Sequence, residues 1–295
     1  MPMTEDTGST VPRRQLGRAL KELRVEAQMT LDGAAEALHC SRQKMWRIES
    51  GLGPVRPLDV RFMCELYGAT RELSDALTNL AAETKAKGWW HSYGNAVPDW
   101  FELYVSLEQT ASHLRGYDES LINGLFQTPD YTRGVYANRP NMPIDELEDV
   151  LEVRRRRQSL LHRVRPKAPR YDSILLESVL LRSIGGPAVM ADQLRRLLAA
   201  TELPNVSVRI LPLAAGAQYG ALTGTFMMLD FPPGNRNVTD PSIIYSESLT
   251  GALYLDRPEE FAAYENAWAS LEALALDEEQ SRRLIIKIIE EVHHG

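Results

Sequence analysis

Apolar residues near the N-terminus recur at intervals of three and four, as on one face of an α-helix. They are Leu16, Leu20, Leu23 and Ala27, within a helix predicted over residues 13–28. Thr30 and Ser41 precede two further short amphipathic segments, and each hydroxyl can cap the helix that follows it. Gly51 suits the end of the last segment. The pattern predicts three short helices, with a turn of about three residues between the second and the third.

The pattern changes after residue 170, where short runs rich in Val, Ile, Leu, Tyr and Phe are separated by Gly, Pro and Asn, as is typical of strands. These runs cover residues 171–179, 206–212, 222–231, 242–248 and 252–255. Helices are predicted over residues 99–118, from Thr128-Pro129 onward, and over 187–202, 257–276 and 277–293. We expect a mainly α N-terminal domain and an α+β C-terminal domain with a mostly antiparallel sheet.

A chain of 295 residues favours two domains, because single cores tend to divide beyond about 250–300 residues. We place the domains at residues 11–84 and 99–293, with a Trp-rich connector at 85–98. Large exposed aromatic groups are unfavourable. We therefore expect Trp89, Trp90 and Trp100 to pack between the domains or at a dimer seam, rather than to form an aromatic ligand cage.

The charge is unevenly distributed. The whole chain carries −7, yet residues 11–56 hold nine Lys and Arg against five Asp and Glu, a balance of +4, and the rest carries −11. A basic head on an acidic body is typical of a protein that binds a polyanion through one face.

The composition, with 44% hydrophobic and 25% charged residues, is that of a globular protein rather than a disordered or membrane protein. No apolar run approaches the roughly 20 residues that a membrane helix needs. The first residues are polar and acidic, unlike a secretory signal, so we expect a cytoplasmic protein. Cys40 and Cys64 stand outside any CxxC or Cys/His cluster, which argues against a zinc site and a disulfide framework.

The predicted pair of short helices around a turn has the helix-turn-helix arrangement, whose second helix enters the major groove of DNA. Residues 16–68 resemble the Cro and phage-repressor (XRE) family of helix-turn-helix domains. The resemblance is carried by Thr30-Leu31, Ala35, Leu38, Ser41, Ile48-Glu49 and Gly51. It implies two further helices, at residues 57–67 and about 70–84. His39 stands where the family usually has a turn glycine, so it must adopt or avoid a positive φ angle. Histidine tolerates such an angle better than a β-branched residue would.

The resemblance also implies roles for individual residues. Base edges would be read by Arg42, Gln43, Lys44 and Arg47. The DNA backbone would be contacted by Thr30, Arg13, Arg14, Arg18, Trp46 and Arg56, although Trp46 could instead pack against its own domain. Arg24 would pair with Glu49 and tie the first helix to the third. The alternative for the whole segment is a plain helical bundle with exposed basic residues.

A second resemblance covers roughly residues 98–290 and is to the C-terminal domain of unknown function that follows an XRE head in a large actinobacterial regulator family. It is carried by Leu107-Glu108, residues 121–131, Arg154, Arg157-Gln158, Gly185-Gly186, Gln193-Leu194 and residues 208–220. The family's turn begins Pro-Gly-Leu-Leu-Gln-Thr, and here it reads Asn123-Gly124-Leu125-Phe126-Gln127-Thr128. Asn in place of Pro should still support a turn.

Candidate chemistry in the C-terminal part is sparse. Polar residues, several of them in the predicted strands, could line a ligand or partner pocket, or could simply face water. They are Gln127, Arg157, Glu177, Gln218, Tyr219, Tyr245 and Glu247. The run Arg154 to Arg157 favours a solvated helix with intrahelical ion pairs over an anion or DNA site. No nucleophile elbow, phosphate loop, dinucleotide fingerprint or zinc-protease motif occurs, so we expect no enzyme, cofactor or metal.

These observations favour a sequence-specific transcriptional regulator, a homodimer on a palindromic operator in double-stranded DNA. It would associate with the nucleoid when bound, and its C-terminal domain would sense a small-molecule effector or a protein partner. The alternative is an antitoxin-like, DNA-binding member of a protein pair, whose C-terminal domain binds a small partner protein encoded nearby. A pull-down that yields one stoichiometric small partner would favour that alternative over a bare homodimer.

Overall fold

The computed structural model describes residues 10–51, 53, 55–83, 99–140, 142–216, 219–232, 242–249 and 251–293. The chain forms two compact units, Met1–Ser92 and Tyr93–Gly295, and each is described by itself. The connector at 85–98 lies outside the described residues, as does the side chain of Trp100, so the expected packing of its tryptophans stays a prediction.

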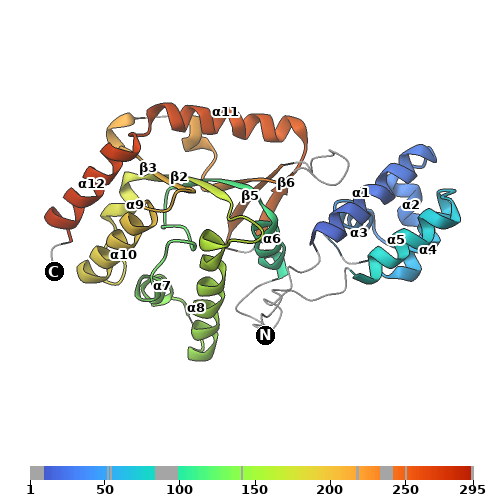
Figure 1. The fold of residues 1–295 in the computed structure, drawn as a ribbon, viewed down its shortest axis with the longest axis horizontal. Helices are drawn as coiled ribbons and strands as arrows, with labels where there is room; N and C mark the ends of the chain where they lie inside the picture. The colour runs from blue at the N-terminus through green and yellow to red at the C-terminus, as the bar shows by residue number, and fades with distance from the viewer. Residues whose placement is uncertain are drawn as a thin grey trace. The chain divides into compact units, whose positions relative to one another are not determined.

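Helices make up the described part of the first unit (Figure 1). They are α1 (Thr10–Glu26), α2 (Leu31–Ala37), α3 (Arg42–Glu49), α4 (Pro57–Leu66) and α5 (Arg71–Glu83). Their apolar sides enclose one core, in which Leu16, Leu20, Met45, Val60 and Met63 are fully buried. The predicted helices occur at the expected places, because the three-and-four spacing of apolar residues gives each helix one side to bury.

The turn between α2 and α3 is closed by local hydrogen bonds. Thr30 Oγ1 accepts from the N–H of Gly33 at 3.1 Å, and Ser41 Oγ accepts from the N–H of Lys44 at 3.1 Å. Both predicted N-caps are therefore confirmed. His39 has a φ of 49°, so it adopts the left-handed conformation for which the family normally uses glycine.

Helix α1 crosses the end of α3 at very short range. A Cβ atom on Gly17 would lie 2.6 Å from the carbonyl oxygen of Ile48 and 2.7 Å from that of Glu49. Only glycine lets the two backbones approach this closely. Gly51 then ends α3 with a φ of 69°, as predicted for a residue at that position.

The second unit contains a six-stranded sheet in the order β3-β2-β1-β4-β5-β6. Its strands are β1 (His113–Asp118), β2 (Arg170–Leu176), β3 (Val206–Leu211), β4 (Phe226–Asp230), β5 (Ile243–Ser248) and β6 (Gly251–Leu255). The pairs β1–β2 and β2–β3 are parallel, whereas β1–β4, β4–β5 and β5–β6 are antiparallel. The predicted mostly antiparallel sheet is thus wrong in detail. The sheet is mixed, because helical crossovers after β1 and β2 return the chain to the end of the sheet where the previous strand began, so that the next strand runs parallel to it.

Helices fill the connections of the second unit. They are α6 (Asp99–Thr110), α7 (Pro129–Tyr136), α8 (Ile144–Gln158), α9 (Glu177–Leu181), α10 (Pro187–Ala200), α11 (Pro258–Leu274) and α12 (Glu278–Glu291), with 3₁₀ turns at Ser159–His162, Leu213–Ala215 and Tyr219–Leu222. Two predictions fail here. The helix expected over residues 99–118 ends at Thr110 and is followed by β1, and Glu177 begins α9 instead of lying in a strand.

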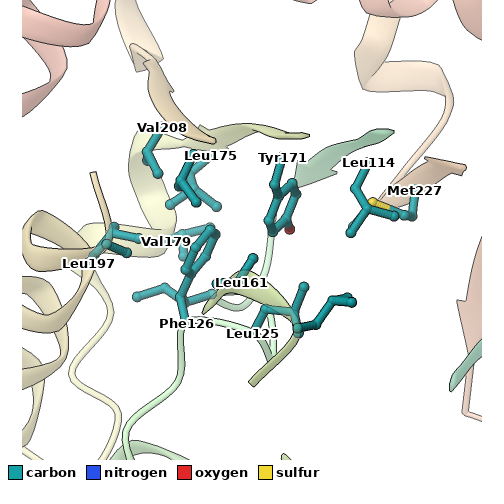
Figure 2. Close-up of a cluster of buried hydrophobic side chains, with 14 of the residues drawn as sticks. Leu114, Leu125, Phe126, Leu161, Tyr171, Leu175, Val179, Leu197, Val208 and Met227 are labelled. Atoms are coloured by element: carbon teal, nitrogen blue, oxygen red, sulfur yellow. The ribbon is translucent and has the colours of Figure 1, made fainter. Parts of the chain in front are cut away.

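Side chains alternate across the sheet, so each face has its own core. On one face, Leu114, Tyr171, Leu175 and Met227 belong to one buried cluster with Phe126 and Val179, and the rings of Tyr171 and Phe126 stack with their centres 5.0 Å apart (Figure 2). On the opposite face, strand residues such as Ile174 and Met228 pack against Trp268 and Leu271 of α11, which covers that side of the sheet in Figure 1. The sheet is therefore covered on both faces.

Candidate functional site

The exposed side of α3 is the candidate nucleic-acid interface. Met45, Ile48 and Glu49 point into the first unit and are at most 5% exposed. The remaining side chains of the helix are exposed; they are Arg42, Gln43, Lys44, Trp46 and Arg47. The helix thus presents three cations and an amide on one side, held by an apolar side that fits the core. Side chains of these types are the ones that hydrogen-bond guanine and adenine edges in the major groove.

The predicted pair between α1 and α3 is present. Arg24 Nε donates to Glu49 Oε1 at 2.6 Å, and Nη2 donates to Oε2 at 2.9 Å. Arg24 Nη1 also donates to the carbonyl oxygen of Met29 at 2.7 Å, just before α2. The hydrogen bond to Glu49 raises the pKa of Arg24. One guanidinium therefore ties α1 to α3 and to the start of α2, which fixes the orientation of the exposed side of α3.

Two of the predicted DNA contacts have acidic partners in the free protein. Arg42 Nη1 donates to Asp32 Oδ2 at 3.0 Å, and both side chains are more than 60% exposed. Arg56 makes a bidentate pair with Asp59, with distances of 2.9 and 2.7 Å. Exposed pairs of this kind contribute little to stability. Either guanidinium could therefore leave its carboxylate for a base edge or a phosphate.

The other predicted backbone contacts are placed unequally. Thr30 already uses its hydroxyl as an acceptor within α2. Arg13 and Arg18 of α1 are partly buried, whereas the side chain of Arg14 lies outside the described residues. Trp46 keeps 40% of its surface exposed, on the same side of α3 as the basic residues. Contact between these residues and DNA stays a prediction.

A cavity of about 910 Å³ in the second unit collects part of the predicted pocket. It lies between α6, α8, the turn that follows β1, and the adjoining ends of β4 and β5. Of the predicted residues, Gln127, Arg157, Tyr245 and Glu247 line it. Glu177 and Tyr219 do not, and Gln218 lies outside the described residues.

The four consecutive arginines of α8 divide into two pairs. Arg155 and Arg156 are exposed and contact Glu152 of the same helix at 2.6 and 2.9 Å, as the sequence predicted. Arg154 and Arg157 line the cavity instead. The interpretation of the run as a solvated helix is therefore wrong for these two residues, because positions three apart share a helix face and this face is turned inward.

Arg157 forms a buried ion pair with Glu108 of α6. Nε donates to Glu108 Oε2 at 2.8 Å and Nη2 donates to Oε1 at 2.7 Å, and neither side chain is more than 5% exposed. The guanidinium also lies 5.0 Å from the ring centre of Phe101 and 5.3 Å from that of Tyr104. The negative charge of Glu108 raises the pKa of Arg157 despite its burial. The charge of Arg157 is thus balanced inside the protein.

The turn after β1 is held by three glutamine side chains. Gln127 Nε2 donates to the carbonyl oxygen of Ile122 at 2.6 Å, and Gln158 Nε2 donates to that of Gln127 at 2.7 Å. Gln193 Oε1 accepts from the N–H of Thr128 at 2.7 Å. Gln127, Gln158 and Gln193, which are among the residues that carry the second resemblance, therefore converge on one turn beside the cavity. Gln127 was predicted as a pocket residue, and its amide also holds the backbone of the turn.

Asp118 lines the cavity but was not predicted as a site residue. It is the last residue of β1 and is only 7% exposed. Its Oδ2 meets no hydrogen-bond donor among the described residues. Burial, together with the nearby charge of Glu247, raises the pKa of this carboxyl from 3.8 to about 8. Because β1 itself was predicted as helix, nothing in the pattern pointed to Asp118 as a cavity residue.

Two family models match the chain. Residues 15–77 match a helix-turn-helix domain, and residues 101–287 match a domain of unknown function (DUF5753). No curated protein and no solved structure matches. In the described residues, no helix combines the length and the apolar character needed to cross a membrane, and no three His, Cys, Asp or Glu residues are grouped as a metal site.

Proposed function

The chain belongs to the family of the domain of unknown function DUF5753 and carries a helix-turn-helix domain ahead of it, and from this premise we propose that it is a sequence-specific transcriptional regulator. The observation that carries the proposal is the exposed side of α3, with Arg42, Gln43, Lys44 and Arg47 on a helix whose other side is locked into the core. Recognition helices of this fold read base edges from such a side.

The proposed recognition chemistry follows from the side chains. Arg42 and Arg47 can each make two hydrogen bonds to guanine O6 and N7, and Gln43 can make two to adenine N6 and N7. Lys44 adds a mobile cation close to the phosphates. Because Arg24 and Glu49 fix α3 relative to α1, the base-reading side chains reach the groove from a rigid support.

We expect the regulator to act as a homodimer. A single small helix-turn-helix unit covers limited DNA surface and binds weakly. Two copies on half-sites about one helical turn apart gain affinity because the second contact is intramolecular. A palindromic operator is the consequence.

The second unit is proposed as the part that receives an input, a small molecule or a partner protein. The charge outside residues 11–56 is −11, which would repel DNA and leave contact to the basic head. We propose a role in regulation rather than as an enzyme, in a cytoplasmic protein that joins the nucleoid when it binds its operator.

Selection of bound sequences from a random duplex DNA pool, with the purified full chain, tests the proposal. We expect an inverted repeat to be enriched. Arg42→Ala and Arg47→Ala should each weaken binding to the selected site by about 1–3 kcal/mol and relax the base preference at one position in each half-site. Arg61→Ala is the matched control, because Arg61 is an exposed arginine of the same unit that lies on α4, where it pairs with Asp75 at 3.5 Å.

The outcomes separate the parts of the proposal. An enriched motif without inverted symmetry would contradict the dimer but not sequence-specific binding. No enrichment, or equal losses for the α3 variants and the Arg61→Ala control, would reject α3 as the reading helix.

A further inference from the structure

One partly buried arginine in the second unit has no counter-ion in contact with it among the described residues. Arg154 lines the cavity, and its only hydrogen-bond partner in this part of the chain is the hydroxyl of Tyr136, 3.5 Å from Nη2. No described carboxylate lies within 4.0 Å of it, and its Nε is buried without an acceptor. Arg157, one helical turn away, has its charge balanced by Glu108. The cavity therefore contains a guanidinium that no described carboxylate contacts directly.

Such a charge is unfavourable unless something pairs with it. Burial lowers the pKa of Arg154, but a guanidinium stays protonated in proteins at neutral pH. An anion placed beside it would supply the missing acceptors and offset the cost of removing the charge from water. Gly124 leaves space beside the two guanidinium groups, because a Cβ atom at this position would lie 2.8 Å from Arg154 Nη1 and 3.1 Å from Arg157 Nη1.

Asp118 does not neutralise this charge at pH 7. With a pKa of about 8, its buried carboxyl is mostly protonated and can itself donate a hydrogen bond to an anionic oxygen. The other acidic groups of the cavity, Glu119 and Glu247, are more exposed, and Glu247 Oε2 accepts from the hydroxyl of Tyr245 at 2.5 Å. The charge of Glu247 acts on both Arg154 and Asp118 through space, but neither Glu119 nor Glu247 lies within 4.0 Å of Arg154, so the guanidinium is still open to an anion.

The rest of the wall is largely apolar and aromatic. It includes Phe101, Tyr104, Val150, Val153 and Met227. A volume of about 910 Å³ falls in the range of about 300–1,000 Å³ that is usual for small-molecule sites. A ligand here would need an apolar body as well as a charged group.

We propose that this cavity binds a small organic acid, whose anionic group pairs with Arg154 and whose apolar body packs against the aromatic and aliphatic wall. The proposal rests on the role proposed for the second unit as the receiver of an input, and it names the chemical class of that input.

Displacement of a fluorescent anion from the full chain tests this proposal without DNA. Anilinonaphthalene sulfonate, which combines an aromatic body with an anionic group, is bound first and is then displaced with octanoate or with octylammonium. These two competitors share a chain length and differ in charge. We expect octanoate to displace the probe at a concentration at least about tenfold lower than octylammonium, because only octanoate can pair with Arg154.

Variants of α8 locate the site. Arg154→Gln should remove the preference for octanoate, whereas Arg154→Lys should retain it, since lysine keeps the positive charge. Arg156→Gln is the matched control: it removes the same charge from the same helix, but on the exposed side, and should leave the preference unchanged.

Equal displacement by the two competitors, or no displacement by octanoate, would overturn the proposal. So would an Arg156→Gln variant that loses the preference as fully as Arg154→Gln. If circular dichroism shows that Arg154→Gln does not fold, the preference of the parent protein still decides. The DNA selection uses a different unit, so a failure here leaves its result standing.

Discussion

Replacing Glu108 with leucine tests how the second unit balances its buried charge. The substitution introduces an apolar side chain of similar size and leaves Arg157 without its carboxylate. Both partners are at most 5% exposed and are joined by two hydrogen bonds of 2.7 and 2.8 Å, so water cannot replace the lost partner easily. Removing one member of such a pair costs about 3–5 kcal/mol in the free energy of unfolding.

The rings beside Arg157 reduce the loss of stability without cancelling it. Phe101 and Tyr104 lie 5.0 and 5.3 Å from the guanidinium, and contacts of this kind contribute roughly 0.5–2 kcal/mol. The double variant Glu108→Leu/Arg157→Leu removes both charges, and replacing a buried pair by apolar residues is often nearly neutral. We therefore expect the double variant to be more stable than Glu108→Leu alone.

Urea unfolding of the full chain, followed by pulsed hydrogen exchange and mass spectrometry, measures this effect. Peptides from α6 and α8 report the second unit separately from the helices of the first. Glu152→Leu is the control on α8, because Glu152 contacts only exposed arginines in the described residues and its loss should cost at most about 1 kcal/mol. A Glu108→Leu loss no larger than that of Glu152→Leu, or a double variant that loses the sum of both single losses, would refute the reasoning.

Two further predictions concern Gly17 and Asp118. Gly17→Ala should destabilise the first unit by about 1–3 kcal/mol and weaken DNA binding, because its Cβ would meet the backbone of α3 at 2.6 Å. Thermal melting checks this against Gly33→Ala, which should lose less because its Cβ would meet only side-chain atoms, at 3.3 and 3.6 Å. Equal melting temperatures for the two variants would speak against it. The raised pKa of Asp118 means that its protonated form stabilises the fold fully below about pH 4 and that this contribution is lost as the pH rises to about 8. Asp118→Asn cannot ionise, so its midpoint in urea, relative to that of the parent, should be higher at pH 9 than at pH 4. The same difference between the two proteins at both pH values would contradict the assignment.

The first unit could be predicted from the sequence because its structure depends on neighbours along the chain. The caps at Thr30 and Ser41 and the apolar spacing of α1 to α3 are local signals, and the Arg24–Glu49 pair followed from the resemblance. Helix and strand positions in the second unit were also largely predicted, apart from β1. That strand reads His-Leu-Arg-Gly-Tyr-Asp, with too few apolar positions to suggest a central strand.

The cavity could be predicted only in part, because its residues come from segments that are far apart in the sequence. Arg155 and Arg156 find Glu152 within one turn of α8, which spacing reveals. Arg157 instead pairs with Glu108, 49 residues earlier, and no pattern along the chain joins the two. The spacing of Arg154 and Arg157 does place them on one helix face, and this signal could have suggested that the face is turned inward.

The position of β1 at the centre of the sheet also bears on how the protein is made. On one side β1 pairs with β2, and on the other with β4, whose residue Asp230 lies 115 positions after its partner Arg115. During synthesis, the sheet cannot close before β4 has left the ribosome, whereas the helices of the first unit need only local contacts. A nascent chain can therefore carry a folded helix-turn-helix head while the strands that complete its second unit are still being translated.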